Sequence, residues 1–386
     1  MMIIVATPLA STSDANDSRT NVNDIFLAEF TDREVIVFSD DLFIDEVRSA
    51  LTSSTSNVYG YASRASVGNA IVLIDELWLA FTSSKQPSAD QIEDLLYSGV
   101  PLIFIKGNSY LYKDSGIELR NRALPQEDGI IYGLYYGPSG VSYAYSCGGT
   151  DSDLPEVLAH AYAWADKAIA EDPEYVKERE LSLERGSFWN LEQTVQFSSP
   201  CSNKGYLNIY TQYYKLMNFN DGYTYYAIKH SQGVAPDLTT SHRVADIYLN
   251  TTLLSGHYLC DTQPASASGT NTCSISFTFS TASPGATVGW SYGISNVKAI
   301  NTSNSGTSKI SIWHDVDETK IVGLGYTAYP GVLLRVANDV NSGSLNITDV
   351  YGVQLAKYTD NSFLGIHYAT WDFYKYHIDV AAYISN

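Results

Sequence analysis

Short, wholly apolar runs separated by helical stretches characterise the first half of the chain. Glu34–Phe38, Ala70–Ile74 and Pro101–Ile105 each predict a buried strand, because a strand covered on both faces needs no polar alternation. Between them, Leu42–Thr52 and Ala89–Tyr97 place apolar residues three and four positions apart, the spacing of one helix face. Apolar strands alternating with helices predict a mainly parallel α/β sheet of the Rossmann or flavodoxin type.

Two tyrosine-rich strands and a helix complete this half. Gly129–Tyr136 and Val141–Tyr145 flank a Gly-Pro-Ser-Gly turn and predict a hairpin at the edge of the sheet. Asp153 is expected to cap a helix that runs through Ile169. The charged segment 172–187 has no apolar face, and we predict a solvated connector helix there.

From residue 188 the pattern changes to alternation. About ten strand-like runs alternate apolar and polar residues between Gly, Pro, Asn and Ser turns, and no helix of useful length is predicted. This part is expected to form an antiparallel β-sandwich. The predicted organisation is a signal remnant or disordered N-terminus over 1–22, an α/β domain over 23–171, the connector helix over 172–187 and the sandwich over 188–386.

Charge is distributed unevenly between the two halves. Residues 1–185 hold 29 acidic and 13 basic residues, whereas residues 186–386 hold 13 and 10. The formal net charge of −19 repels a phosphate backbone, so we expect no nucleic-acid partner. The second half is instead rich in Ser, Thr, Asn and Tyr, a surface suited to contacts with other chains or sugars outside the cell.

Several features indicate export. The run Met1–Ala10 is apolar and ends in small residues, like the tail of a secretory signal whose basic region is missing. Sequons at Asn16, Asn250, Asn301 and Asn346 fit an exported glycoprotein. No stretch approaches the roughly 18 apolar residues of a transmembrane helix, so none is expected. We predict a secreted or cell-surface location.

The four cysteines allow two disulfides. Cys260 and Cys273 bracket a loop rich in Ser, Thr, Gly and Pro, and a bridge there stabilises a fold by about 3 kcal/mol. Cys147 and Cys201 would then join the two halves of the chain. The sequence does not choose among the connectivities, and four buried thiols are the alternative.

The order of features resembles a loosely defined set of secreted or surface proteins of thermophilic archaea, of unassigned function. The matching stretches are Gly129–Tyr136, Leu158–Ala165, Gly222–His230 and Ser291–Val297. The resemblance implies a location and an architecture, and it implies no site residues.

Acidic residues follow two of the predicted parallel strands. Asp40, Asp41 and Asp75 lie at strand ends, with Lys106 after a later strand, as in the Mg²⁺-binding acid pocket of a phospho-receiver domain. Lys106 follows the fourth strand, where that pattern has Ser or Thr. The alternative is that these acids cap the helices and loops that follow them.

Two further groups are candidates for binding. Asp315, Asp317 and Glu318, after His314, offer oxygen ligands to Ca²⁺, although solvated turn acids are the alternative; no other cofactor is expected. Near the C-terminus, Tyr374 and Tyr376 fall on one face of an aromatic strand and Trp371 and Phe373 on the other. We consider the tyrosine face a surface for a neighbouring chain or sugar, or a plain solvent face.

No catalytic motif selects an enzymatic function. The chain has no HExxH, GxSxG or Walker sequence, and its seven histidines are scattered. We therefore expect a non-enzymatic extracellular surface, filament or adhesin protein whose β-sandwich binds copies of itself, cell-surface glycans or other proteins. The alternative is a secreted hydrolase with an α/β catalytic domain and a carbohydrate-binding sandwich. A pore-forming protein ranks last, because no alternating amphipathic hairpin of bilayer length is evident.

Overall fold

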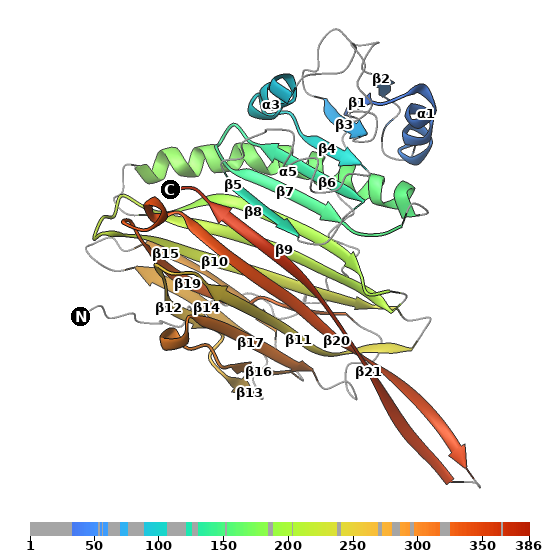
Figure 1. The fold of residues 1–386 in the computed structure, drawn as a ribbon, viewed down its shortest axis with the longest axis vertical. Coiled ribbons are helices and arrows are strands. Elements are labelled where there is room, and N and C mark those ends of the chain that lie inside the picture. The colour runs from blue at the N-terminus through green and yellow to red at the C-terminus, as the bar shows by residue number, and fades with distance from the viewer. Residues whose placement is uncertain are drawn as a thin grey trace. The chain divides into compact units, whose positions relative to one another are not determined.

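The computed structural model is mostly β, with one large mixed sheet, a second sheet and a separate two-stranded ribbon (Figure 1). Of the described residues, 188–191 and 198–386 form one compact unit, unit 1, and 33–183 and 192–197 form another, unit 2. The structure describes residues 33–52, 55, 57–60, 70–75, 89–105, 121–125, 130–150, 153–183, 188–202, 204–237, 241–268, 272–279, 286–293, 297–316, 325–363 and 366–386.

The large sheet corrects the predicted fold class. It has 12 strands, in the order β12-β19-β10-β9-β8-β7-β6-β4-β3-β1-β2, with β18 paired to β10. An N-terminal Rossmann- or flavodoxin-like α/β sheet followed by a separate antiparallel β-sandwich is therefore wrong. Strand β8 (Phe188–Pro200) has residues in both units. A change of surface charge does not end a sheet, because the backbone N–H and C=O groups of an edge strand can still form hydrogen bonds with a further strand.

Unit 2 is built on the apolar runs of the first half. β1 (Val35–Phe38), β3 (Ile71–Asp75) and β4 (Leu102–Ile105) form where strands are predicted, and every residue of β1 and β4 is buried. β1 pairs in parallel with β2 and β3, β3 pairs in parallel with β4, and β4 pairs antiparallel with β6. The other elements of this unit are β2 (Val58–Gly60), β5 (Asn121–Pro125), β6 (Ile131–Tyr136), β7 (Ser142–Cys147), α1 (Asp41–Ala50), α3 (Ala89–Tyr97) and α5 (Leu154–Leu183).

Helix α5 covers both the helix predicted from Asp153 and most of the predicted connector helix 172–187. Trp164 stacks on Tyr145 at 5.4 Å between ring centroids. A Cβ at Gly133 would lie 2.5 Å from the Trp164 ring, so β6 needs glycine where this helix approaches. Asp172, in the range predicted to be solvated, is buried and accepts hydrogen bonds from the hydroxyl and the backbone N–H of Ser139.

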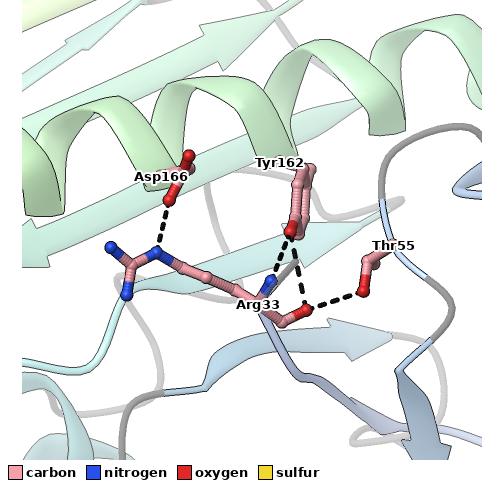
Figure 2. A network of polar contacts seen from close by, with 4 residues as sticks. All are labelled: Arg33, Thr55, Tyr162 and Asp166. Atoms are coloured by element: carbon pink, nitrogen blue, oxygen red, sulfur yellow. Dashed lines mark hydrogen bonds and ion pairs between the residues drawn. The ribbon is translucent and has the colours of Figure 1, made fainter. Parts of the chain in front are cut away.

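A network of polar contacts joins α5 to the segment that leads into β1 (Figure 2). The Arg33 guanidinium forms an ion pair with Asp166, and the Arg33 backbone N–H donates to the Tyr162 hydroxyl at 3.0 Å. The hydroxyl of Thr55 donates to the Arg33 carbonyl at 2.8 Å. Side chains from two distant parts of unit 2 therefore satisfy the backbone groups of one residue where the strand begins.

Unit 1 contains long antiparallel strands, as expected for this part of the chain. In the large sheet, β9, β10, β19 and β12 lie side by side, and in the second sheet the order is β13-β16-β17-β11-β20-β21. Burial alternates along β17 and over most of β11, so one face of these strands is directed inward, whereas β19 is buried at every position but Arg335. Their bounds are β9 Gly205–Met217, β10 Tyr223–Pro236, β11 His242–Leu253, β12 His257–Gln263, β13 Ala267–Ser268, β14 Thr272–Phe279, β15 Ala286–Gly293, β16 Val297–Asn301, β17 Lys309–Val316, β18 Tyr326–Ala328, β19 Gly331–Ala337, β20 Leu345–Phe363 and β21 Ile366–Ile384.

The last two strands form a hairpin that extends past its neighbour. β20 pairs with β21 from Leu345 to Phe363, whereas its pairing with β11 ends at Lys357. Figure 1 shows the far end of this hairpin projecting from the second sheet. Beyond Lys357, β20 therefore extends past the end of β11.

Polar side chains lie between the inner faces of the two sheets of unit 1. The Tyr351 hydroxyl of β20 is 2.8 Å from Thr211 Oγ1 of β9 and 2.8 Å from His230 Nδ1 of β10. On its own sheet, the fully buried Asp349 accepts hydrogen bonds from Thr251 and, at 3.4 Å, from Tyr351. A core that would otherwise pack on apolar contacts alone is thus also joined by directional bonds.

The carboxyl of Asp349 has no cationic partner in this network. Burial raises its pKa to about 7, although the hydrogen bonds from Thr251 and Tyr351 lower it. Burial lowers the pKa of His230 to about 3, so the imidazole is neutral at pH 7. The pKa values of Tyr213 and Tyr351 are raised well above their usual value, chiefly by burial. The groups facing Asp349 are therefore neutral, and the protonated carboxyl is the form that this core stabilises.

Asp349→Asn is expected to remove a pH dependence of stability. The folded chain retains the Asp349 proton up to about pH 7, whereas the unfolded chain loses it near its ordinary pKa. Stability of the wild type should therefore decrease as pH rises from about 4 to 7, by about 4 kcal/mol for a shift of this size. The variant should lack this slope and be the more stable protein at pH 8, as measured by urea unfolding between pH 4 and 9.

The matched control is Asp339→Asn, because Asp339 is exposed. It should retain the wild-type slope. Parallel curves for the wild type and Asp349→Asn would show that the buried carboxyl is ionised throughout and would contradict this account.

Candidate functional site

The acidic residues at the strand ends of unit 2 have structural roles. Asp40 caps α1, and its Oδ1 accepts a hydrogen bond from the Phe43 backbone N–H at 2.9 Å. Asp41 is exposed in the first turn of the helix, where a carboxylate is favourable. Asp75 Oδ2 accepts from the Ser39 hydroxyl at 2.7 Å. The structure thus brings Ser39 and Asp75 together, while Lys106 lies outside the described residues.

The predicted calcium ligands are described only in part. Asp315 is exposed on β17, opposite Lys298 of β16 and Asp246 of β11, whereas Asp317 and Glu318 lie outside the described residues. His314 points to the other face and is buried, which lowers its pKa to about 4. Across the part of the chain that the structure describes, no three His, Cys, Asp or Glu side chains are grouped as a metal site would require.

The structure gives no support to the two predicted disulfides. Cys147, Cys201 and Cys260 are thiols, the first two buried. Burial raises the pKa of Cys201 to about 12 and that of Cys260 to about 11, so both are protonated at neutral pH. Cys260 lies at a bulge of β12 in the large sheet, whereas Cys273 belongs to the ribbon. The two cysteines are therefore in different sheets, although they are close in sequence.

The sequons differ in the surroundings of their asparagines. Asn250 and Asn346 are half-buried on β11 and β20. The amide nitrogen of Asn301 donates to the carbonyl of Pro264 at 2.8 Å and to the Thr262 hydroxyl at 3.0 Å. A glycan on that nitrogen would displace these bonds, so Asn301 supports the loop after β12. Asn16 lies outside the described residues.

Tyr374 and Tyr376 are half-buried on the same face of β21 as the buried Ile378. Lys204 Nζ lies 4.7 Å from the centre of the Tyr374 ring and 5.8 Å from that of Tyr376. The opposite face carries Phe373, which is 51% exposed. The tyrosines as a contact surface stay a prediction, and among the Phe, Tyr and Trp side chains of this strand that the structure describes, Phe373 is the most exposed.

Alternation in the sequence predicts strands at β14 and β15, but it does not predict that the two pair as a separate ribbon, which forms a sheet of its own. Its register pairs Ile275 with Trp290 and Phe277 with Val288, so these four share one face. Ile275 and Phe277 are buried. On the other face, Ser276 pairs with Gly289, and Ser291 is exposed. The ribbon is therefore apolar on one face and carries small and hydroxyl-bearing residues on the other.

The ribbon packs by its apolar face on the outer face of the large sheet. The Trp290 indole N–H donates to the Tyr329 carbonyl at 2.8 Å, and the Phe277 and Trp290 rings meet edge to face at 5.9 Å. A Cβ at Gly331 of β19 would lie 2.6 Å from the Trp290 ring and 2.9 Å from that of Phe277. Because glycine has no side chain, these two rings lie directly against the backbone of β19.

Lys229 lies beside this contact between the ribbon and Gly331. It pairs with Gly331 across β10 and β19, and its Nζ is 5.7 Å from the centre of the Trp290 ring. Burial lowers the pKa of Lys229, so the ribbon is packed over a partly desolvated ammonium group. The contact with the indole face offsets part of that desolvation.

The sequence did contain a signal for this ribbon. No Asp, Glu, Lys or Arg occurs between Thr262 and Val297. Within that segment, apolar and small polar residues alternate on both sides of residues 280–285. The strands of the ribbon have eight residues each, so the ribbon does not contradict the expectation that no alternating amphipathic hairpin of bilayer length is evident.

Comparisons with known proteins yield similarity in structure only. No family model and no curated protein matches the sequence. One solved structure is titled "Pore forming protein", with 6% identity and a TM-score of 0.34 over 50% of this chain and 90% of that one. Another is the Clostridium perfringens NetB toxin in its membrane-inserted form, with 6% identity and a TM-score of 0.30 over 50% and 96%. Similarities at this level do not establish a common fold.

The resemblance to surface proteins of thermophilic archaea stays a prediction, because none of these matches bears on it. None of the helices in the described part of the chain combines the length and the apolar character that crossing a membrane requires.

Gly331→Val is expected to displace the ribbon from the sheet. The added side chain meets the Trp290 and Phe277 rings, and such overpacking costs about 1–3 kcal/mol. We expect tryptophan emission to shift to the red and limited proteolysis to cleave within 272–293. Ser231→Val is the control, because it introduces the same valine side chain two residues from Lys229 on the same face of β10. Equal protection of the ribbon from proteolysis in both variants would show that its packing on the sheet does not depend on glycine at position 331.

Proposed function

We propose that this chain is a non-enzymatic extracellular protein that binds lipid bilayers through the ribbon β14–β15 and self-associates there. The observation that carries the proposal is the ribbon itself, with one apolar face, one face of small and hydroxyl residues, and no charged residue from Thr262 to Val297. A soluble domain gains little from so long a charge-free surface segment, whereas a lipid-facing one requires it.

The apolar face of the ribbon is stabilised to a comparable degree whether it packs on protein or on lipid. Burial of a side chain such as Phe277 or Ile275 contributes about 1.5–3 kcal/mol, and hydrocarbon replaces the sheet as the apolar surroundings. A single Lys or Arg at the middle of a bilayer costs about 2–4 kcal/mol, and the ribbon has none. Release also returns Lys229 to water, which removes the desolvation that lowers its pKa.

Self-association follows from the backbone of the ribbon. β14 pairs with β15 and with no third strand in the described part of the chain, so each strand has an outer edge whose backbone N–H and C=O groups can pair with a further strand. In lipid, each such group costs several kcal/mol unless it is hydrogen-bonded. Ribbons of further copies supply the matching edges, which makes assembly on the membrane a condition for insertion.

Val288→Lys and Ser291→Lys test which face meets lipid. Val288 lies on the apolar face and Ser291 on the polar face of the same strand. Val288→Lys should reduce association with phosphatidylcholine vesicles at least about thirtyfold, from the cost of one lysine in hydrocarbon. Ser291→Lys should change it less than about threefold. Co-flotation with vesicles and release of a trapped dye measure both, with circular dichroism as the check on folding.

Gly331→Val is the gain-of-function arm, because displacing the ribbon should increase vesicle association at low protein concentration. Chemical cross-linking of the vesicle-bound protein should give species larger than a dimer. A wild type that neither floats with vesicles nor releases dye would refute the proposal, as would equal effects of Val288→Lys and Ser291→Lys.

A further inference from the structure

A cluster of aromatic and charged residues lies on the outer face of the large sheet, around Arg335. Tyr258 of β12, Arg335 of β19 and Tyr225 of β10 stand opposite one another on three neighbouring strands. Tyr223 lies two residues before Tyr225 on the same face, and Asp221 belongs to the turn between β9 and β10. We call these five residues the Arg335 cluster.

The guanidinium of Arg335 lies against two tyrosine rings. Its central carbon is 4.5 Å from the ring centre of Tyr223 and 5.4 Å from that of Tyr258. The two rings meet edge to face at 6.0 Å, with 82° between their planes. Tyr258 is 46% exposed, so an aromatic surface faces solvent beside the guanidinium. No carboxylate of the described residues forms an ion pair with Arg335.

Asp221 is held beside this aromatic surface by hydrogen bonds. Its Oδ2 accepts from the Tyr225 hydroxyl at 2.8 Å, and its Oδ1 accepts from the Tyr223 backbone N–H at 3.2 Å. Asn218 and Gly222, with φ of 57° and 88°, fix the turn in a left-handed conformation. The carboxylate is exposed and retains lone pairs for a ligand. The site is therefore formed before any ligand arrives.

The charges in the cluster favour a ligand without net charge. Burial raises the pKa of Cys260, the positive charge of Arg335 lowers it, and the negative charges of Asp261 and Asp221 raise it. Arg335 and Asp221 thus place one cation and one carboxylate in the same small region. A phosphate or carboxylate ligand would be repelled by Asp221, and a cationic ligand by the guanidinium. Hydroxyl groups suit both, since they donate to Asp221 and accept from Arg335.

We propose that the Arg335 cluster binds the ring of a neutral hexose, as in the uncharged glycans of a cell surface. The C–H face of the sugar lies on the exposed ring of Tyr258, and two of its hydroxyls bond to Asp221 and Arg335. A small, open site of this kind binds one sugar weakly, with a Kd on the order of 1 mM. Several copies on one surface multiply that affinity by avidity.

Titration of the full chain with soluble, neutral hexosides tests the site. The probes are the methyl glycosides of glucose, galactose and mannose, followed by saturation-transfer NMR and calorimetry. Tyr258→Ala and Arg335→Lys should each weaken binding of the preferred hexoside at least about tenfold, and Tyr258→Phe should retain it, because the ring face is the contact. Tyr206→Ala is the matched control, because Tyr206 is 48% exposed elsewhere on the same sheet; it should leave the Kd within about twofold.

Three outcomes would overturn the proposal: none of the hexosides binds the wild type, Tyr206→Ala weakens binding as much as Tyr258→Ala does, or phosphocholine or sialyllactose binds the cluster in preference to them. Tyr258 is exposed, so Tyr258→Ala is not expected to disturb folding, which thermal unfolding checks. The titration needs no membrane, so its result is distinct from that of the vesicle experiments on the ribbon.

Discussion

The contact of Phe277 and Trp290 with the bare backbone at Gly331 is the interaction on which the functional account depends. It holds a charge-free ribbon on a sheet to which the ribbon does not belong. Side chains make this contact, with one indole N–H donating to the Tyr329 carbonyl. A contact of this kind is exchangeable, because lipid offers the same apolar surroundings that the sheet does. Gly331 is the residue that allows it, and Lys229, whose pKa burial lowers, lies beside it.

The two sheets of unit 1 are joined by hydrogen bonds between buried side chains. Between the two sheets of unit 1, Tyr351, His230 and Thr211 form directional bonds around a carboxyl that the core stabilises in its neutral form. Such a network specifies one relative position of the strands that it joins, since any slip leaves buried polar groups unpaired. Two different surfaces lie on the outer face of one sheet of unit 1, the ribbon and the Arg335 cluster. The proposed attachment to lipid and the proposed recognition of a sugar are thus assigned to separate surfaces of the same sheet.

The sequence allowed local structure to be predicted better than its assembly. Val35–Phe38 and Leu102–Ile105 are buried strands because nothing polar interrupts them, and Asp40 caps a helix because its carboxylate satisfies an otherwise unpaired N–H. The drop in charge near residue 185 is real, but it marks a change of surface and not the end of a sheet. Strand order depends on edge pairing between distant segments, which periodicity does not encode.

The candidate sites show the same limit. Alternation predicts strands at Ser274–Phe279 and Val288–Ile294, but only the register of Ile275 with Trp290 shows that these strands pair with each other and which residues share a face. Arg335 and Asp221 are more than a hundred residues apart, so no motif joins them. The most direct test of the central claim is to place an environment-sensitive fluorophore at 287 or at 288 and add vesicles that contain a lipid-borne quencher. The account predicts quenching at 288 and exposure to aqueous iodide at 287; aqueous exposure at both positions would contradict it.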